Sequence, residues 1–341
     1  MSIGSILLVG KREEPHLGGS LYRAARQLGL RVHFLSTQEA FDSHRLLQAF
    51  CWHVLGHRPP RLGRFSTEVV EAVRTHRPDI VLTTGIAPVT AEALREIGVL
   101  GATRLNYSTD DPWNSNHRAS WFFDALPHYD IVFTPRHANE DQFRDLGCGT
   151  EYLPFGYDPD LFHPVSLSEE EQERYDADIV FVGGGDEDRL EFIAPLINAG
   201  FEVALYGGYW DQYDVTAPYA EGIVPPKTVN KATRAADIAL CLVRRANRDE
   251  HVMRSFEIPA IGSCMLVEDT GDHRRLFGEE GKRVVYFDSL DTLVERAKEL
   301  RNRSRMRKRL AEAVHEHIVE DRRHTYGKRL ETMITKTAQF V

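Results

Sequence analysis

Residues 179–189 read Ile-Val-Phe-Val-Gly-Gly-Gly-Asp-Glu-Asp-Arg. The apolar residues at the start predict a short strand that is buried on both faces of a sheet. The glycines that follow, Gly183, Gly184 and Gly185, allow a tight turn and the close approach of a ligand to the backbone. Arg189 begins the next helical stretch, where a cation can meet a diphosphate or can simply be solvated. A strand, a glycine loop and a helix in this order predict a parallel α/β sheet.

The same alternation of short apolar strands and amphipathic helices extends on both sides of this stretch. In the first half, we expect strands at 3–9, 32–35, 80–83, 104–107 and 131–134, and helices at 20–28, 67–75, 89–97 and 138–146. In the second half, we expect strands at 179–182, 203–206, 238–242, 265–267 and 284–287, and helices at 189–199, 228–236, 252–260 and 290–300. The pattern predicts an α/β protein of two tandem Rossmann-like domains facing a cleft, with ligands at the carboxyl ends of the strands.

The alternation stops between residues 154 and 178, where prolines and a run of acids replace it. We therefore expect a first domain at 1–163, a linker at 164–177 and a second domain at 178–318. The last segment, 319–341, is helical in pattern, and we expect it to pack back toward the first domain. A chain of 341 residues is long enough for two domains of about 150 residues each.

Composition excludes several classes of protein. The net charge of −9 argues against a general nucleic-acid binder and leaves nucleic acid only as an acceptor substrate. The four cysteines form no C-x-x-C pair, which indicates reduced thiols rather than disulfides or a zinc site. No apolar run approaches the roughly 18 residues of a membrane span, and the apolar stretch 3–9 leads straight into charged residues, unlike a signal peptide. We therefore expect a cytoplasmic protein.

Two clusters of charged or ligand-type residues lie near the C-terminus. The basic stretch 301–309 is typical of a solvated helix face, with a peripheral contact to anionic lipid or nucleic acid as the alternative. His315, His317 and His324 do not have a firm metal-binding spacing, and we expect them on an exposed helix. The oligomeric state is open.

The most specific stretch of the second half is 249–269 (DEHVMRSFEIPAIGSCMLVED). Asp249 and Glu257 lie on either side of a predicted loop-to-helix junction, with Arg254 and Ser255 just before Glu257. A carboxylate at this place can accept hydrogen bonds from both ribose hydroxyls, while the helix N-terminus and Arg254 face phosphates. The stretch thus predicts a nucleotide site that is built without a P-loop.

The first half offers two candidate sites at predicted strand ends. The loop that begins at 107–112 (YSTDDP) carries Asp110 and Asp111 beside a proline, and His117 shares that loop. Paired carboxylates there can orient an acceptor hydroxyl or act as a base, and a simple Asp-rich turn is the alternative. Gly19, with Gly18 before it, follows the first strand without a G-x-G-x-x-G spacing, so it allows either a close ligand approach or an ordinary tight turn.

Several of these motifs together resemble a known family. The stretch 254–260 (RSFEIPA), with Gly262 and 268–270 (EDT), resembles the signature of the spore-maturation CgeB-like proteins, a group within the group-1 glycosyltransferases. Further segments that fit the resemblance in order are 107–112 (YSTDDP), 153–164 (LPFGYDPDLFHP), 181–183 with Arg189, and 324–326 (HTY) with Arg329. The resemblance implies a GT-B fold, a nucleotide-diphosphate sugar donor of UDP or GDP type, a hydroxyl acceptor, retention of configuration, and no required metal or cofactor.

In the wider group, two glutamates eight positions apart mark the donor site. Glu257 matches the second, which implies that it holds the ribose. Asp249 stands where the first glutamate is expected and is shorter by one methylene, and Glu250 is an acid one residue out of register. Of the cations that the group places over the diphosphate, Arg189 is the match, and further candidate cations are Arg244, Arg245 and Arg254.

Two other functions remain open at this point. A nucleotide-sugar epimerase or hydrolase would use the same fold and donor site with different chemistry. A non-catalytic sugar-nucleotide binding protein would keep the donor site without turnover, and the shorter side chain at Asp249 keeps this alternative open.

Overall fold

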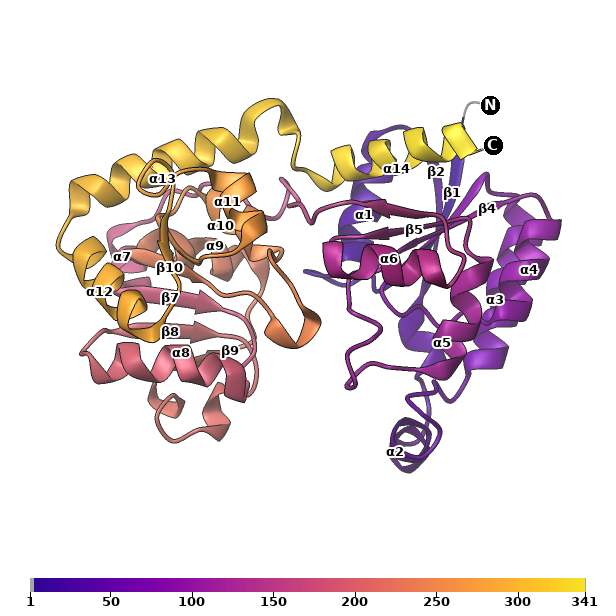
Figure 1. Cartoon of the computed structure of the whole chain (residues 1–341), viewed down its shortest axis with the longest axis horizontal. Coiled ribbons are helices and arrows are strands. Elements are labelled where there is room, and N and C mark those ends of the chain that lie inside the picture. Colours follow the sequence, from indigo (N-terminus) through magenta and orange to yellow (C-terminus); the bar gives the residue numbers. More distant parts are fainter. Residues whose placement is uncertain (1–2, 341) are drawn as a thin grey trace. The chain divides into compact units, whose positions relative to one another are not determined.

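The computed structural model describes residues 3–340 and contains two parallel six-stranded sheets, one in each half of the chain (Figure 1). The first sheet has the order β2-β1-β3-β4-β5-β6. Its strands are β1 (Ser5–Gly10), β2 (Arg31–Ser36), β3 (Ile80–Thr84), β4 (Thr103–Tyr107), β5 (Ile131–Thr134) and β6 (Thr150–Tyr152). The direction of winding reverses between β1 and β3, so the loops after these strands open at the switch point of the sheet.

The second sheet has the order β12-β11-β10-β7-β8-β9, with all neighbours parallel. Its strands are β7 (Ile179–Val182), β8 (Val203–Tyr206), β9 (Ala220–Gly222), β10 (Ile238–Cys241), β11 (Met265–Glu268) and β12 (Val285–Phe287). Here the winding reverses between β7 and β10. The expected α/β class and parallel sheets are confirmed, and the strands that the sequence did not predict, β6 and β9, are edge strands of three residues each.

Helices cover both faces of each sheet. In the first half they are α1 (Leu17–Gln27), α2 (Arg45–His53), α3 (Leu62–His76), α4 (Ala91–Val99), α5 (Ser120–Ala125) and α6 (His137–Asp145). In the second half they are α7 (Glu169–Tyr175), α8 (Glu187–Asn198), α9 (Pro226–Ala235), α10 (Arg254–Ile261), α11 (Gly271–Phe277), α12 (Leu290–Arg301), α13 (Ser304–Val319) and α14 (Tyr326–Phe340).

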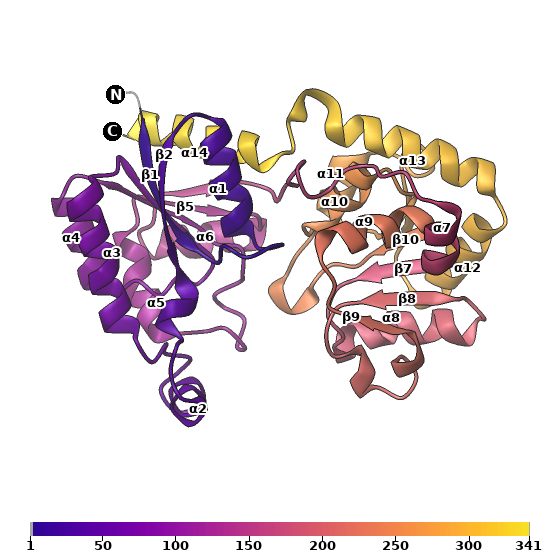
Figure 2. The ribbon, with the colours of Figure 1, turned by 180° about the vertical axis from the view of Figure 1, so that it is seen from behind.

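The core of the first half follows from the alternation of side chains along its strands. Leu7 and Val9 of β1 lie in one apolar cluster with side chains from α3 to α6, including Phe65 and Phe143. The residue between them, Leu8, is also buried and points to the opposite face. Helices α1 and α14 pack against each other, as the view from behind shows (Figure 2). Burial on both faces explains why these strands read as continuous apolar runs.

The second sheet is covered in the same way. Val180 and Ala239 belong to a cluster that contains residues of α9, α10 and α13. Phe181 and Leu240, one position further along the same strands, belong to a separate cluster with α8 and α12. β7 and β10 therefore each contribute to two cores, which fixes the loops at their carboxyl ends.

The chain separates into two compact units by its contacts. The first unit ends at Pro154 and also contains 246–248 and the residues from Tyr326 onward, including α14; the second contains 155–245 and 249–325. Residues 1, 2 and 341, which the expected domains include, lie outside the described residues.

Residues 155–163, which were expected in the first domain, and residues 164–177, which were expected to be a linker, both form part of the second unit. Phe155, Tyr157 and Phe162 are buried in its core, because aromatic side chains alternate with the prolines and acids that made the stretch look irregular. Within 164–177, α7 forms behind a capping box in which Ser168 accepts from the backbone N–H of Glu171 and the Glu171 side chain accepts from that of Ser168.

Candidate functional site

The switch point of the second sheet brings together most of the residues expected to bind the donor. The loop after β7 contains Gly183 to Gly185, and the loop after β10 contains Arg244 and Asp249 before α10 begins. Both loops start at the carboxyl edge of neighbouring parallel strands. In doubly wound sheets this edge is where ligands bind.

The glycine loop is packed against the loop after β8. The backbone N–H of Gly185 donates to the carbonyl of Gly208 (2.8 Å), and Trp210 Nε1 donates to the carbonyl of Gly183 (2.8 Å). A Cβ on Gly185 would lie 3.0 Å from the Trp210 ring, whereas one on Gly184 would have its nearest neighbour at 3.6 Å. Gly183 and Gly185 are therefore needed for packing, and Gly184 has room above it.

Arg189 folds back over this loop. Its Nη1 donates to the carbonyl of Gly184 (2.7 Å) and lies 3.4 Å from the carboxylate of Asp186, which caps α8. Burial lowers the pKa of the Arg189 guanidinium, although an arginine stays charged at neutral pH. Its Nε is buried and has no hydrogen-bond partner among residues 3–340. A buried donor of this kind is suited to an anionic ligand.

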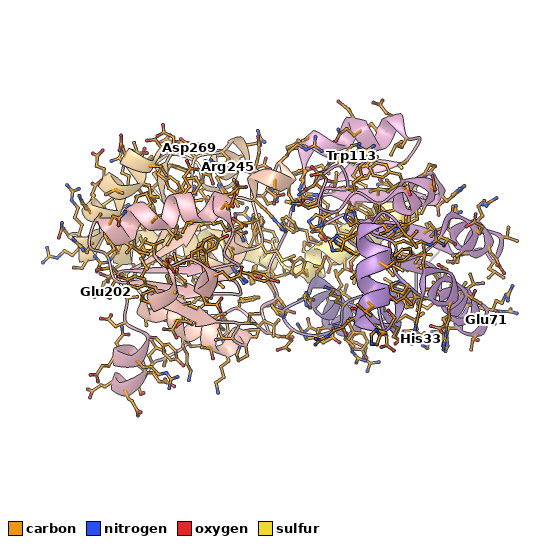
Figure 3. The ribbon with its side chains drawn as sticks, turned by 90° about the horizontal axis from the view of Figure 1, so that it is seen from below. His33, Glu71, Trp113, Glu202, Arg245 and Asp269 are labelled. Atoms are coloured by element: carbon orange, nitrogen blue, oxygen red, sulfur yellow. The ribbon has the colours of Figure 1, made fainter. Side chains whose placement is uncertain are left out.

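Two more arginines of the expected set differ in how they are paired. Arg245 contacts the buried carboxylate of Glu268 (3.0 Å) and lies 4.0 Å from Glu191, so its charge is already compensated (Figure 3 labels Arg245). Arg244 is exposed, and its side chain makes no hydrogen bond or ion pair within the part of the chain that the structure describes. Its charge acts on Arg189 and lowers the pKa of that group. Arg244 thus adds an unpaired positive charge that acts on Arg189.

The start of α10 places Arg254 and Glu257 next to the end of β7. Arg254 Nε donates to the carbonyl of Val182 (3.2 Å), and its Nη1 is ion-paired with the Glu257 carboxylate. Glu257 is 3% exposed. The helix ends at Gly262, which has a φ of +85°, as the sequence predicted.

Asp249 lies near this group and is also buried. Its backbone N–H donates to the carbonyl of Arg244 (3.3 Å). Burial lowers the pKa of Arg189, and the negative charge of Asp249 partly offsets this lowering. Asp249 and Arg244 therefore lie close enough to Arg189, which contacts the glycine loop, for their charges to act on it.

Ser255 does not face this neighbourhood. Its side chain is fully buried, and its hydroxyl lies 2.8 Å from His273 Nε2 and accepts from the backbone N–H of Val252 (3.0 Å). The sequence placed Ser255 just before Glu257 as a candidate donor-site residue. In the structure, its hydroxyl ties α10 to α11.

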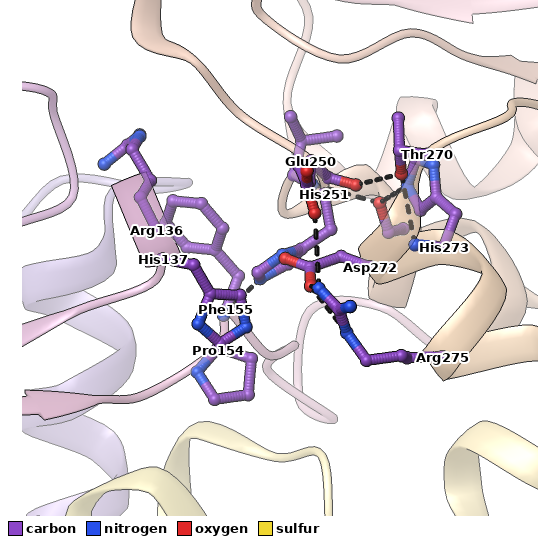
Figure 4. A network of polar contacts seen from close by, with 12 residues as sticks. Arg136, His137, Pro154, Phe155, Glu250, His251, Thr270, Asp272, His273 and Arg275 are labelled. Atoms are coloured by element: carbon purple, nitrogen blue, oxygen red, sulfur yellow. Dashed lines mark hydrogen bonds and ion pairs between the residues drawn. The ribbon is translucent and has the colours of Figure 1, made fainter. Parts of the chain in front are cut away.

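A buried polar network behind α10 was not predicted from the sequence (Figure 4). His251 Nε2 accepts from the backbone N–H of Phe155 (3.1 Å), and His251 Nδ1 lies 2.8 Å from the Asp272 carboxylate. Asp272 is also ion-paired with Arg275, and Arg275 reaches Glu250 (3.3 Å). Burial would raise the pKa of Asp272, but the bonds from His251 and Arg275 outweigh burial and lower it. The network anchors the loop that carries Asp249.

His273 completes this anchoring. Burial lowers its pKa to about 4, so the ring is neutral at neutral pH. Its Nδ1 lies 2.7 Å from the carbonyl of Glu268 and donates to it, which leaves Nε2 to accept from the Ser255 hydroxyl. No sequence pattern links these positions, because only the adjacency of β10 and β11 brings them together.

In the first unit, the two aspartates after β4 have different surroundings. Asp111 is buried; its carboxylate accepts from Arg248 Nε (2.6 Å), from Asn139 (2.9 Å) and from the backbone N–H of Trp113 (3.0 Å). Asp110 is partly exposed, and among residues 3–340 no hydrogen bond or ion pair involves its carboxylate. The carboxylate lies above Gly85, whose Cβ would be 3.2 Å from it. Asp110 is thus the carboxylate available to a ligand.

The other two candidates of the first unit, His117 and Gly19, lie where the backbone packs closely or turns. His117 is half-buried in the turn after Asp111, and its backbone N–H donates to the carbonyl of Asn114 (2.9 Å). Gly18 and Gly19 lie inside α1 rather than in the loop before it. A Cβ on either would come within 2.4 Å of the carbonyl oxygen of Lys11 or Arg12, so both glycines serve close backbone packing.

We expect Asp111→Asn to lower the free energy of unfolding of the first unit by about 1–3 kcal/mol at neutral pH. Burial would raise the pKa of Asp111, but its bonds from Arg248, Asn139 and Trp113 outweigh burial and lower it. A lowered pKa contributes stability above the unfolded value of about 3.9, and this contribution is lost as the pH falls through the folded value. The difference between variant and wild type should therefore shrink below about pH 4.

Urea unfolding followed by tryptophan fluorescence measures this, since the backbone N–H of Trp113, which Figure 3 labels, donates to Asp111. The matched control is Asp141→Asn, an exposed acid on α6 paired only at the surface with Arg144. If the Asp111 variant unfolds at the same urea concentration as the control, the buried ion pair does not hold this loop.

The described residues contain neither a cluster that could hold a metal ion nor a helix that could cross a membrane. Between residues 3 and 340, no group of three or more His, Cys, Asp or Glu side chains is arranged to hold a metal ion. His315 and His317 instead contact the carbonyls of Pro259 (2.9 Å) and Leu276 (2.8 Å). In the same range, none of the helices has the length and apolar character that a membrane crossing requires.

Comparison with known proteins supports the same architecture. Residues 189–335 match a family model described as "Glycosyl transferase-like". Among curated proteins, none matches the sequence significantly. Three solved structures are similar over almost the whole chain, and each is less than 25% identical to it.

The first is a sucrose-phosphate synthase from Thermosynechococcus elongatus, at 13% identity, a TM-score of 0.69, and 98% of each chain covered. The second is Anabaena Alr3699/HepE in complex with UDP-glucose, at 11% identity, a TM-score of 0.62, and 98% of this chain and 99% of that one covered. The third, from Listeria monocytogenes, is assigned as a UDP-N-acetylglucosamine 2-epimerase, at 13% identity, a TM-score of 0.58, and 100% and 98% covered. At these identities the likeness shows the fold, and the chain has the GT-B fold of two tandem Rossmann-like domains.

Proposed function

We propose that this chain is a glycosyltransferase that moves a sugar from a nucleotide-diphosphate sugar to a hydroxyl group of an acceptor. The observation that carries the proposal is the group of residues at the switch point of the second sheet. There, Arg189 donates to the carbonyl of Gly184, and the charges of the unpaired Arg244 and of Asp249 act on it. The match to the glycosyl transferase-like family begins at Arg189 and includes all of these residues except the glycine loop.

Each residue has a role that fits its surroundings. Arg189 and Arg244 bind the diphosphate, and Gly184 lets it approach the backbone. As the bond to the sugar breaks, negative charge develops on the leaving diphosphate, and fixed cations stabilise that charge without reorganising. The N-terminus of α10 adds a positive dipole end near Arg254. Glu257 accepts hydrogen bonds from the ribose, and Asp249 lies toward the sugar.

Three finer features belong to the same proposal. The motif around Glu257 supports placing the chain with the CgeB-like group, and this placement implies retention of configuration. The cations just described supply the charge stabilisation for which other transferases use a metal, so we propose that no metal is needed. The first unit binds the acceptor, with Asp110 as the carboxylate that orients or deprotonates its hydroxyl.

A second function is favoured by one specific observation. The Listeria monocytogenes structure assigned as a UDP-N-acetylglucosamine 2-epimerase has the same fold, so the fold alone does not distinguish transfer from epimerisation. An epimerase would change a UDP-sugar without any acceptor. A binding protein would show tight nucleotide binding and no product under any condition.

The test begins with a thermal-shift panel of UDP, GDP, their common sugar conjugates, and AMP as a control. A ligand at about 100 times its Kd should stabilise the folded protein by about 2.7 kcal/mol, or about 5–10 °C in melting temperature. We expect UDP or GDP compounds to exceed AMP clearly. Equal shifts for all of them would contradict a dedicated donor site.

The preferred donor is then incubated with pooled hydroxyl acceptors, and products are analysed by mass spectrometry with and without acceptor. A glycosylated product that needs the acceptor supports transfer, whereas an altered sugar nucleotide without acceptor supports epimerisation. Activity should persist in EDTA. Complete loss in EDTA that Mn²⁺ or Mg²⁺ restores would contradict the metal-independent part of the proposal.

A further inference from the structure

Helix α2 of the first unit exposes an unusual number of large apolar side chains. Figures 1 and 2 both show it standing away from the sheet of its unit. Of its nine residues, Cys51 is the buried one. The residues that we call the α2 apolar face are Leu46 (76% exposed), Leu47 (49%), Phe50 (50%) and Val54 (63%).

These four side chains share one side of the helix. At 100° per residue, positions 46, 47, 50 and 54 fall within an arc of about 100°. Leu55, which is 46% exposed, follows the helix, whereas Trp52, which is 39% exposed, falls on the opposite side of the helix from this face. A single exposed apolar residue needs no explanation, but a contiguous group of them marks an interaction surface.

The same segment is strongly basic in an acidic chain. The whole chain carries a net charge of −9, yet the segment from Ser43 to Arg64 contains no Asp or Glu. Its basic residues are His44, Arg45, His53, His57, Arg58, Arg61 and Arg64.

Two of these arginines are free to meet an anionic partner. Arg61 is paired with Asp42 (3.0 Å) and Arg64 with Glu68 (2.9 Å). The side chains of Arg45 and Arg58 make no hydrogen bond or ion pair with any residue between 3 and 340. Apolar side chains for insertion and unpaired cations for attraction therefore lie in one short segment.

We propose that the α2 apolar face, with Arg45 and Arg58, docks on a membrane surface that contains anionic lipid. A short amphipathic helix with cations binds in the plane of the interface by burying its apolar face below the headgroups. Basic residues near the surface strengthen binding to anionic membranes, and Arg45 and Arg58 would supply this attraction. A second copy fits the surface less well, since its own α2 segment would bring arginines against arginines.

The proposal is independent of the donor site and of the glycosyltransferase function. The test uses the full chain and sedimentation with vesicles of phosphatidylcholine alone or with 30% phosphatidylglycerol. We expect binding to the anionic vesicles to be at least tenfold stronger than to the neutral ones, and to weaken as salt is raised.

Two double variants separate the apolar and the charged contributions. Leu46→Ser with Phe50→Ser should weaken binding at least tenfold, whereas the control Val99→Ser with Ile223→Ser, at residues 88% and 86% exposed elsewhere, should not. Arg45→Gln with Arg58→Gln should also weaken binding roughly tenfold on anionic vesicles. Unchanged circular dichroism and melting temperature show that each variant is folded.

Several results would overturn the proposal. One is wild-type binding by the Leu46/Phe50 variant, and another is equal binding to neutral and anionic vesicles. A third is that Arg305→Gln loses vesicle binding while the α2 variants keep it, which would assign the contact to the basic stretch 301–309. A fourth is a dimer in light scattering that the Leu46/Phe50 variant abolishes, without vesicle binding, which would make the face a contact between copies.

Discussion

Glu257→Gln should weaken binding of the preferred nucleotide about tenfold to a few hundredfold. A carboxylate that accepts hydrogen bonds from two ribose hydroxyls makes charge-assisted bonds of about 1.5–3 kcal/mol each. The amide keeps the shape and one acceptor oxygen, so the loss is partial. Glu257 is also ion-paired with Arg254 in the first turn of α10, and the amide oxygen can still accept from that guanidinium. We therefore expect only a small change in melting temperature.

The matched control is Glu250→Gln. Glu250 is exposed, lies one residue from Asp249, and is paired at the surface with Arg275 (3.3 Å). Surface ion pairs of this kind contribute little, so nucleotide affinity and stability should both stay the same. Calorimetric titration and a melting curve on each variant measure the two quantities.

The competing explanation is that Glu257 has a purely structural role. If the carboxylate only holds Arg254 against the end of β7, its amide variant would lower the melting temperature and leave nucleotide affinity alone. An unchanged Kd would falsify the assignment of the donor site and remove the main support for the proposed function.

Most of the fold could be predicted from the sequence because both sheets are parallel and buried on both faces. Strands such as β7 and β10 are continuous apolar runs, and such runs are hard to mistake when helices separate them. The edge strand β9 reads Ala-Glu-Gly and is partly exposed, so it carries no such signal. The segment 155–177 was misjudged because its buried aromatics are spaced by prolines and acids, although Ser168 and Glu171 have the spacing of a capping box.

The donor site could be predicted only in part. Local motifs indicated Glu257, Arg254 and the glycine loop, because a helix start and a strand end are visible in one short stretch. They did not indicate that Ser255 turns inward to His273, since that depends on α11 lying behind α10. The contact of His251 with Asp272 joins residues 21 positions apart, and only the pairing of β10 with β11 brings them together.

The paired aspartates of the first unit show how structure refines a sequence prediction. Asp110 and Asp111 have the same chemistry, and their order along the loop does not show which one could act as a base. Their burial distinguishes them. Asp111 accepts hydrogen bonds from Arg248 and Asn139, whereas Asp110 is partly exposed above Gly85. A residue whose acceptor positions are already filled is a poor base, so the catalytic expectation passes to Asp110 alone.

Asp110→Asn should therefore lower kcat about a hundredfold or more while leaving nucleotide affinity unchanged. A positioned base contributes roughly 10²–10⁴-fold to a proton transfer, and the amide cannot take the proton from an acceptor hydroxyl. Nucleotide affinity should be unaffected because the residues proposed to contact the ribose and the diphosphate all lie in the second unit. Steady-state kinetics with the acceptor found above, together with titration of the nucleotide alone, measures both.

Asp111→Asn is the matched control, since it makes the same carboxylate-to-amide change at the neighbouring residue. Its main effect should be on stability, and at a temperature where it is folded its kcat should stay within a few-fold of wild type. If Asp110→Asn raises the acceptor KM but keeps kcat, Asp110 positions the acceptor and another group removes the proton. If both variants keep full activity on the true acceptor, the loop after β4 is only a turn, and the catalytic side chain must be sought elsewhere on the first unit.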